Sequence, residues 1–215
     1  MSATVSYMSM SLDGFIAGPD AGPGNGLGDG GERLHEWVLT GAANDDGTGT
    51  PALVQGGVNG RIVDEFMSTG AVVAGRGTFE PAGGWGGDHH DGVPIFILSR
   101  RDPGIDITAW PLVTYLDDVG TAMAQAKEAA GDRNVLVHGA AVTQLALAAG
   151  VLDELEIHLV PVLLGGGRRL FGDQGPHDVE LDRTRVLHGE DGVTHLHFRV
   201  RHGVEADQSS TRRVS

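Results

Sequence analysis

Gly139, Ala140 and Ala141 are the residues of this chain whose types and spacing point most clearly to chemistry. They lie between an apolar run at 134–138, typical of a strand, and a helical pattern at 141–149. The first amide hydrogens of such a helix lack internal acceptors and carry a partial positive charge. Small side chains let an anion approach those amides closely. The spacing favours a phosphate-binding turn, although a turn that needs small residues only for packing has the same pattern.

Two other apolar runs end in residue types that bind phosphate. The run at 71–74 is followed by Gly75-Arg76-Gly77-Thr78, and the run at 93–98 by Ser99-Arg100. Guanidinium groups pair with phosphate oxygens through two hydrogen bonds. In an open parallel sheet, ligands bind beyond the carboxyl ends of the strands. Each motif alone is weak, but three such strand ends together indicate a phosphate-containing ligand.

The pattern of apolar residues predicts a single α/β domain at 1–202 and a disordered tail at 203–215. Strands alternate with helices, so we expect a largely parallel sheet with helices on both faces, a three-layer α/β/α arrangement. A hairpin around 189–192 adds antiparallel strands at one edge. Strands are expected at 4–10, 71–74, 93–98, 112–115, 134–138, 155–160, 185–187 and 194–200, and helices at 32–39, 61–67, 119–130 and 141–149.

Composition restricts the class of protein. The chain has 215 residues, 40% of them hydrophobic, a formal net charge of -14 and no cysteine. The negative charge argues against binding a nucleic-acid backbone, and the absence of cysteine excludes disulfides and thiolate zinc sites. We see no apolar run long enough for a membrane span and no leader peptide, so we expect a cytoplasmic protein without membrane partners. Glycine-rich loops at 18–31 and 41–60 are expected to line or cover a site.

Several tempting motifs are set aside. Gly26-x-Gly28-x-x-Gly31 matches a dinucleotide fingerprint, but a loop separates it from the preceding strand, which that motif does not allow. Asp88-His89-His90-Asp91 contains metal-binding residue types, yet we expect a solvated turn and no metal. His188, His195 and His197 are interpreted as structural.

The ordered set of motifs resembles the dihydrofolate-reductase-like superfamily, and within it stand-alone homologues of the reductase domain of the riboflavin-biosynthesis deaminase-reductase. The resemblance spans roughly residues 3 to 201. It is carried by Ser11-Leu12-Asp13-Gly14-Phe15-Ile16-Ala17, Gly75-Arg76-Gly77-Thr78-Phe79, Leu98-Ser99-Arg100, Val137-His138-Gly139-Ala140-Ala141, and Leu152-Asp153-Glu154-Leu155 followed by Pro161-Val162-Leu163-Leu164-Gly165.

The resemblance implies the superfamily's fold, an NADPH-dependent reductase and, as the commoner state of such domains, a homodimer. It implies cofactor-binding roles for residues in four segments. Gly14, Ile16 and Ala17 would line the nicotinamide end, Gly75, Arg76 and Thr78 would meet the pyrophosphate, Ser99 and Arg100 would hold the 2′-phosphate, and Gly139, Ala140, Ala141, Val142 and Thr143 would form the pyrophosphate turn. Family members often have two glycines where this chain has Gly139-Ala140.

The substrate side is defined only by analogy with the family. Asp29, Glu32, His35 and Trp37 are expected beside the nicotinamide, and Glu36 and Asp13 are the candidate proton donors; bound water is an alternative. The expected reaction is hydride transfer to a C=N or C=O carbon of a small pteridine-like or pyrimidine-like heterocycle. Two alternatives stay open: a non-catalytic NADPH-binding or sensing protein on the same fold, and a true dihydrofolate reductase.

Overall fold

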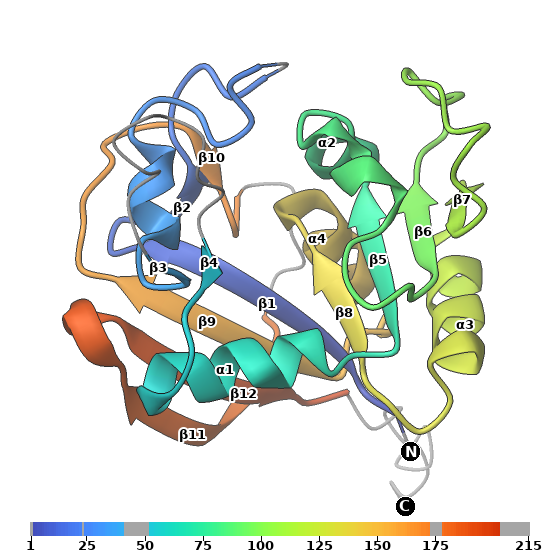
Figure 1. The fold of residues 1–215 in the computed structure, drawn as a ribbon. Coiled ribbons are helices and arrows are strands. Elements are labelled where there is room, and N and C mark those ends of the chain that lie inside the picture. The colour runs from blue at the N-terminus through green and yellow to red at the C-terminus, as the bar shows by residue number, and fades with distance from the viewer. Residues whose placement is uncertain (1, 23, 41–51, 173–177, 203–215) are drawn as a thin grey trace, which may run out of the picture.

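A computed structural model describes residues 2–22, 24–40, 52–172 and 178–202, and in these residues eight strands form one central sheet. The strands are β1 (Thr4–Ser11), β5 (Ala71–Gly75), β6 (Ile95–Leu98), β7 (Val113–Leu116), β8 (Val135–His138), β9 (Glu154–Val160), β11 (Leu181–His188) and β12 (Thr194–Val200). Their order across the sheet is β11-β12-β9-β1-β8-β5-β6-β7 (Figure 1).

The sheet is mixed but mostly parallel. All neighbours from β9 through β1, β8, β5 and β6 to β7 pair in parallel. The hairpin of β11 and β12 adds two antiparallel pairings beside β9. This confirms the expected sheet with antiparallel strands at one edge. Parallel pairing also places the carboxyl ends of β8, β5 and β6 side by side.

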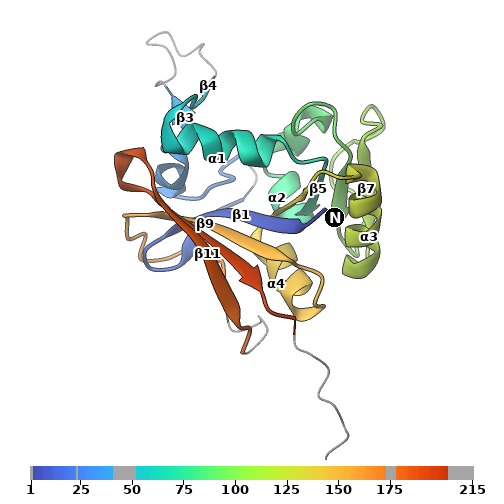
Figure 2. The same cartoon turned by 90° about the horizontal axis from the view of Figure 1, so that it is seen from below.

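Helices cover both faces of the sheet, which confirms the three-layer α/β/α fold. The helices are α1 (Gly57–Met67), α2 (Arg76–Phe79), α3 (Val119–Ala130) and α4 (Ala140–Ala148). Val73, Val135 and Val137 pack in one cluster with residues of α3 and α4, whereas Val72 and Leu136 face the cluster that contains Phe66 of α1 and Phe79 of α2. Seen from below, α1 and α4 lie on opposite sides of the sheet (Figure 2). Burial on both faces explains the nearly continuous apolar runs of these strands.

Short elements complete the part of the chain that the structure describes. They are the 3-10 segments η1 (Gly31–His35), η2 (Gly83–Gly87) and η3 (Glu190–Gly192), the strand pair β2 (Phe15–Ala17) and β10 (Arg168–Arg169), and the strand pair β3 (Leu39–Thr40) and β4 (Ala52–Leu53). Among the described residues, no helix has both the length and the apolar character needed to cross a membrane. The predicted tail at 203–215 lies outside the described residues.

The prediction of a helix at 32–39 is wrong. The segment forms only the short η1, which Gly30 precedes in a left-handed conformation with φ 73°. Leu39 then pairs with Leu53 in an antiparallel strand pair. The indole Nε1 of Trp37 donates a hydrogen bond to Ser9 Oγ at 2.9 Å, which fixes the segment against β1. Tertiary contacts therefore override the helical pattern here.

Helix α1 begins four residues earlier than its apolar pattern predicts, at Gly57 instead of Arg61. The carboxylate of Glu190 accepts hydrogen bonds from the amides of Val58 and Asn59, both at 2.9 Å. These amides belong to the first turn, where a helix has no acceptors of its own. The carboxylate that accepts the free amide hydrogens at the start of α1 therefore comes from a residue more than 130 positions later in the sequence.

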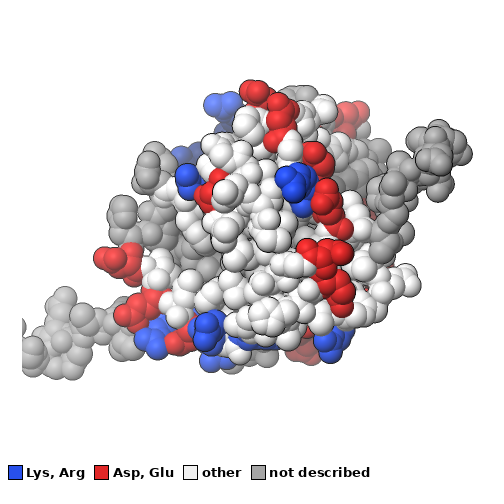
Figure 3. All heavy atoms as spheres, turned by 90° about the vertical axis from the view of Figure 1, so that its left-hand side faces the viewer, with Lys and Arg blue, Asp and Glu red and all other residues white. Residues whose placement is uncertain are grey.

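Charged side chains are interspersed on the face of the molecule shown in Figure 3. Acidic and basic groups surround a broad area without charges, and no single sign dominates that view.

Replacement of Phe79 tests the packing of α2. Phe79 is fully buried and contacts the rings of Trp85, Trp110 and Tyr115 edge-on. Phe79→Ala should lower the free energy of unfolding by about 3–5 kcal/mol because it leaves a cavity that the neighbouring rings fill only in part. Urea unfolding followed by circular dichroism measures the loss. Leu163→Ala, at a side chain that is 69% exposed, is the control and should change stability by less than about 0.5 kcal/mol. A loss below about 1 kcal/mol for Phe79→Ala would contradict this account.

Candidate active site

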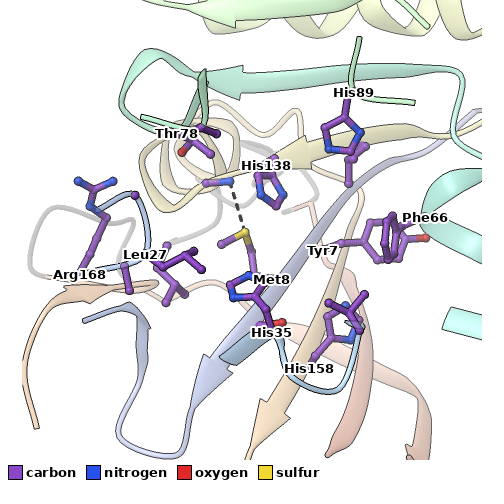
Figure 4. Close-up of a pocket in the computed structure, with 18 of the residues that line it drawn as sticks. Tyr7, Met8, Leu27, His35, Phe66, Thr78, His89, His138, His158 and Arg168 are labelled. Atoms are coloured by element: carbon purple, nitrogen blue, oxygen red, sulfur yellow. Dashed lines mark hydrogen bonds between the residues drawn. The ribbon is translucent and has the colours of Figure 1, made fainter. Parts of the chain in front are cut away.

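A cavity of about 420 Å³ opens between β1, the carboxyl end of β8 and the segments around η1 and η2. Arg168 and Thr78 lie at one end of it and Tyr7 and Phe66 at the other, with His138 and Met8 between them (Figure 4). Its volume is in the usual range for small-molecule sites. It is lined by Tyr7, Met8, Ser9, Ile16, Ala17, Gly26, Leu27, His35, Trp37, Val38, Phe66, Gly77, Thr78, Ala82, Trp85, His89, Leu136, His138, Gly139, His158 and Arg168.

Gly139 forms the wall where β8 turns into α4. Its φ is +98°, and an added Cβ would overlap the hydroxyl of Thr78, so the turn requires glycine. Its amide donates a hydrogen bond to Met8 Sδ at 3.3 Å, a weak acceptor. Among the described residues, the amides of Ala140, Ala141 and Val142 donate to no backbone carbonyl. The start of α4 therefore offers free donors to an anion.

Val142 and Thr143 contribute to this turn from inside the protein. Both side chains are buried, and the hydroxyl of Thr143 lies 2.7 Å from Ser6 Oγ and donates to the carbonyl of Gly139 at 3.0 Å. The bond with Ser6 joins α4 to β1, and the bond to Gly139 closes the first turn of α4. Neither Val142 nor Thr143 lines the cavity.

The strand ends next to β8 carry the other predicted cofactor residues. Gly75 ends β5, and the following residues form the short helix α2, not an open loop. Thr78 lines the cavity, whereas Arg76 lies 3.8 Å from Glu80, with 31% of its side chain exposed. Ser99 Oγ accepts a hydrogen bond from the amide of Arg101.

Arg100 follows β6 and is exposed, outside the cavity lining. Parallel register places Gly139, Arg76 and Arg100 along one edge of the sheet, as the sequence predicts. Neighbouring strands are about 4.8 Å apart. An elongated ligand that begins in the cavity would therefore pass Arg76 and reach Arg100.

The segment after β1 divides into two parts. Ile16 and Ala17 line the cavity, as expected for residues beside a nicotinamide ring, while Gly14 does not. The carboxylate of Asp13 accepts hydrogen bonds from Ser11 Oγ and from the amides of Leu164 and Gly165. These bonds lower its pKa, with the Ser11 hydroxyl as the largest cause. Asp13 thus ties two loops together at the rim and does not face the cavity.

The predicted substrate residues are only partly brought together. Trp37 and His35 line the cavity, but Asp29, Glu32 and Glu36 are exposed and outside the lining. Among the described residues, no aspartate or glutamate lines this cavity. The candidate proton donors Asp13 and Glu36 therefore have no direct path to a ligand there.

Four histidines form much of the inner wall. Burial lowers the pKa of His89 to about 3 and that of His138 to about 4, and it lowers the pKa values of His35 and His158 as well. All four are thus neutral near pH 7. Within the described part of the chain, the buried Nδ1 atoms of His35 and His138 have no hydrogen-bond partner. Buried polar atoms are normally paired, so these two nitrogens are exceptions within the described part of the chain.

The interpretation of Asp88-His89-His90-Asp91 as a solvated turn is wrong for its two histidines. His90 is 5% exposed, and its Nε2 lies 3.3 Å from Thr69 Oγ1. His89 Nδ1 lies 2.7 Å from His90 Nδ1, and the His89 ring meets Trp85 edge-on. The segment therefore folds inward and supplies one wall of the cavity.

Sequence reasoning missed Tyr7, Met8, Phe66 and Arg168 as lining residues. The first two alternate along β1 like ordinary core residues, and Phe66 sits in the apolar stripe of α1, so no local signal marks them. Arg168 has a signal, because it directly follows three glycines that let the chain approach β2. Its guanidinium lies 3.5 Å from the carbonyl of Gly77, across the mouth of the cavity.

Comparison with solved structures identifies the fold. A protein from Shewanella sp. PV-4 assigned to riboflavin biosynthesis matches with a TM-score of 0.68 and 21% identity, over 93% of this chain and 99% of that one. RibD from Acinetobacter baumannii matches with a TM-score of 0.61 and 17% identity, over 94% and 58%. Dihydrofolate reductase from Enterococcus faecalis, complexed with NADP(H), matches with a TM-score of 0.53 and 14% identity, over 93% and 97%. These likenesses confirm the dihydrofolate-reductase-like fold.

The search of curated proteins gave no match. The family comparison is decisive, because the model described as the RibD C-terminal domain matches residues 4–195, nearly the whole chain. That match confirms the expected resemblance, and this chain therefore belongs to the family of RibD C-terminal domains, which are reductase domains.

Proposed function

We propose that this protein is an NADPH-dependent reductase that transfers a hydride to a C=N or C=O carbon of a small, flat, uncharged heterocycle. One observation carries the proposal: a single cavity joins a phosphate-type turn at Gly139 to a wall of aromatic and imidazole rings. The first feature suits a dinucleotide and the second a ring-shaped substrate. Membership of a reductase family supports the same conclusion.

The chain's own residues fit the cofactor. The free amides at the start of α4, the hydroxyl of Thr78 and the guanidinium of Arg168 surround the place for the pyrophosphate. Ile16 and Ala17 line the same cavity, which supports a role for them beside the nicotinamide ring. Arg100, further along the edge, is the candidate for the 2′-phosphate. When bound there, NADPH supplies the hydride, and the protein orients it and keeps water out.

The substrate end selects for a flat and neutral molecule. Tyr7, Trp37 and Phe66 provide apolar ring surface, and the histidines beside them carry no charge near pH 7. A cationic ring would lack a countercharge in this wall, since the lining of the described chain contains no carboxylate. A true dihydrofolate reductase is therefore the weaker candidate. We assign proton delivery to a water molecule in the cavity, because Asp13 and Glu36 lie outside it.

Cofactor preference tests this proposal through Arg100. Titration with NADPH and NADH, followed by nicotinamide fluorescence, should show tighter binding of NADPH. Arg100→Ala should weaken NADPH about ten- to a hundredfold and leave NADH nearly unchanged, because it removes a charged hydrogen bond to the 2′-phosphate. Arg61→Ala, an exposed arginine on α1, is the matched control and should have no effect. Failure of wild-type protein to bind either nucleotide would refute the proposal.

The neutral histidine wall predicts how stability depends on pH. The unfolded chain protonates His138 near pH 6.5, whereas the folded chain does so only near pH 4. This contribution to stability is therefore complete above pH 6.5 and decreases as the pH falls toward 4, by about 1.4 kcal/mol per pH unit at most. Urea unfolding between pH 7.5 and 4.5 should show a smaller loss for His138→Phe than for wild type. His188→Phe, at an exposed site on β11, should retain the wild-type slope, and equal slopes for all three proteins would be the contrary result.

A further inference from the structure

A buried chain of hydrogen bonds leads from the cavity wall to helix α1. His158 on β9 lies opposite His195 on β12, and their Nδ1 atoms are 2.9 Å apart. The other ring nitrogen of His195, Nε2, lies 3.0 Å from Asn59 Oδ1. All three side chains are at most 3% exposed. Solvent therefore does not compete for these bonds.

The position of each proton in this chain follows from Asn59. Its Nδ2 group faces two backbone carbonyls, that of Trp37 at 3.3 Å and that of Glu190 at 3.4 Å. Carbonyl oxygens only accept hydrogen bonds, so the amide nitrogen must point to them and Oδ1 must point to His195. Nε2 of His195 then donates to Asn59.

Neutral imidazoles carry one proton each, which fixes the next bond. Burial lowers the pKa of His195 to about 4 and that of His158 well below its usual value, so both rings are neutral at pH 7. With its proton on Nε2, His195 has a bare Nδ1 that accepts. His158 must therefore donate from its own Nδ1, and its Nε2 has no proton.

That Nε2 is the atom of His158 available to a ligand. His158 lines the cavity beside Tyr7 and Trp37, whose ring centroids lie 6.3 and 4.5 Å from its own. Its Nδ1 is directed toward β12, and ring geometry turns Nε2 away from that bond. The described residues provide Nε2 with no hydrogen-bond partner. The cavity wall thus presents a hydrogen-bond acceptor at this point.

We propose that Asn59 and His195 are positioning residues that hold His158 in the tautomer with a bare Nε2, so that the cavity selects ligands bearing an N–H or O–H donor at that point. A ligand that places a carbonyl oxygen there is disfavoured, because the lone pair of that oxygen faces the lone pair of His158 Nε2. The statement about ligands rests on the proposed function, because it takes this cavity to be the substrate site. The assignment of the tautomers does not depend on the proposed function.

The hydrogen-bond chain from His158 through His195 to Asn59 holds each proton in one position and does not conduct protons. Beyond His195 the chain ends in a side-chain amide, which does not exchange protons readily, and in backbone carbonyls. Gly189 packs directly over the bond between His195 and Asn59. An added Cβ there would overlap Asn59 Oδ1 and lie 2.7 Å from His195 Nε2. Its φ of -79° suits any residue, so Gly189→Ala should disturb this bond without straining the backbone.

Long-range ¹H–¹⁵N NMR of the full chain, labelled with ¹⁵N-histidine, tests the tautomers directly at pH 7.5. We expect His158 to carry its proton on Nδ1 and His195 on Nε2. His158→Gln and His195→Gln assign the signals by their disappearance. A proton on Nε2 of His158 in wild type overturns the proposal, whatever the function of the protein.

Two variants test whether Asn59 sets the tautomer. Gly189→Ala and Asn59→Leu should each give a mixture of tautomers at His158, because the bond between the two histidines can then reverse direction. Gly172→Ala is the matched control, since an added Cβ there meets nothing within 4 Å. An unchanged single tautomer at His158 in whichever of the two variants folds overturns the positioning role.

A pair of small probes tests the ligand preference. 2-Pyridone offers a lactam N–H, and N-methyl-2-pyridone has the same ring without that donor. With NADPH present, wild type should bind 2-pyridone about three- to tenfold more tightly, as expected for one hydrogen bond, with a shift of the His158 Nε2 signal. The ratio should approach one in Gly189→Ala. If wild type does not prefer 2-pyridone, failure to bind it included, the ligand preference is overturned, whereas failure of NADPH itself to bind contradicts the proposed function instead.

Discussion

Parallel pairing of β8 with β5 and of β5 with β6 is the constraint on which the site depends. It places three carboxyl strand ends along one edge of the sheet, and each is followed by residues that can bind an anion. The same pairing buries both faces of these three strands, which explains why they are mostly apolar. The anion-binding candidates therefore lie in the turns that follow these strands, where backbone amides and the side chains of Thr78 and Arg100 are free of the core.

Sequence reasoning succeeds where a local pattern decides the structure. The apolar runs, the small residues after β8 and the hairpin at 189–192 each carry their own signal, so the fold and the sheet edge at which the candidate anion-binding residues lie could be predicted. It fails where distant groups decide. Glu190 accepts the first amide hydrogens of α1, and Ser9 accepts a hydrogen bond from the indole of Trp37. His89 packs inward against Trp85, and no pattern in the sequence around His89 predicts this contact.

The cavity wall illustrates the second kind of feature most clearly. Its members come from β1, β2, η1, α1, α2, η2, β8, β9, β10 and the loops between them, and most of the apolar and aromatic side chains resemble core residues in their own elements. Only their convergence makes a site. Asp29, Glu32 and Glu36, which the family resemblance suggests for the substrate side, are exposed at the surface. Neutral imidazoles such as that of His138 line the interior of the cavity instead. The uncharged, ring-rich wall at the inner end of the cavity therefore follows from the tertiary structure and not from any local pattern.

The position of β1 in the middle of the sheet has a consequence for the order of folding. This first strand pairs with β8 and β9, whose residues lie more than 130 positions later, and helix α1 is capped by Glu190. Contacts so remote in sequence form late, after a large loss of chain entropy. A chain still emerging from the ribosome would have its early loops and its first strand but no complete wall. A ligand that needs the complete wall could therefore stabilise this protein only after synthesis is nearly finished.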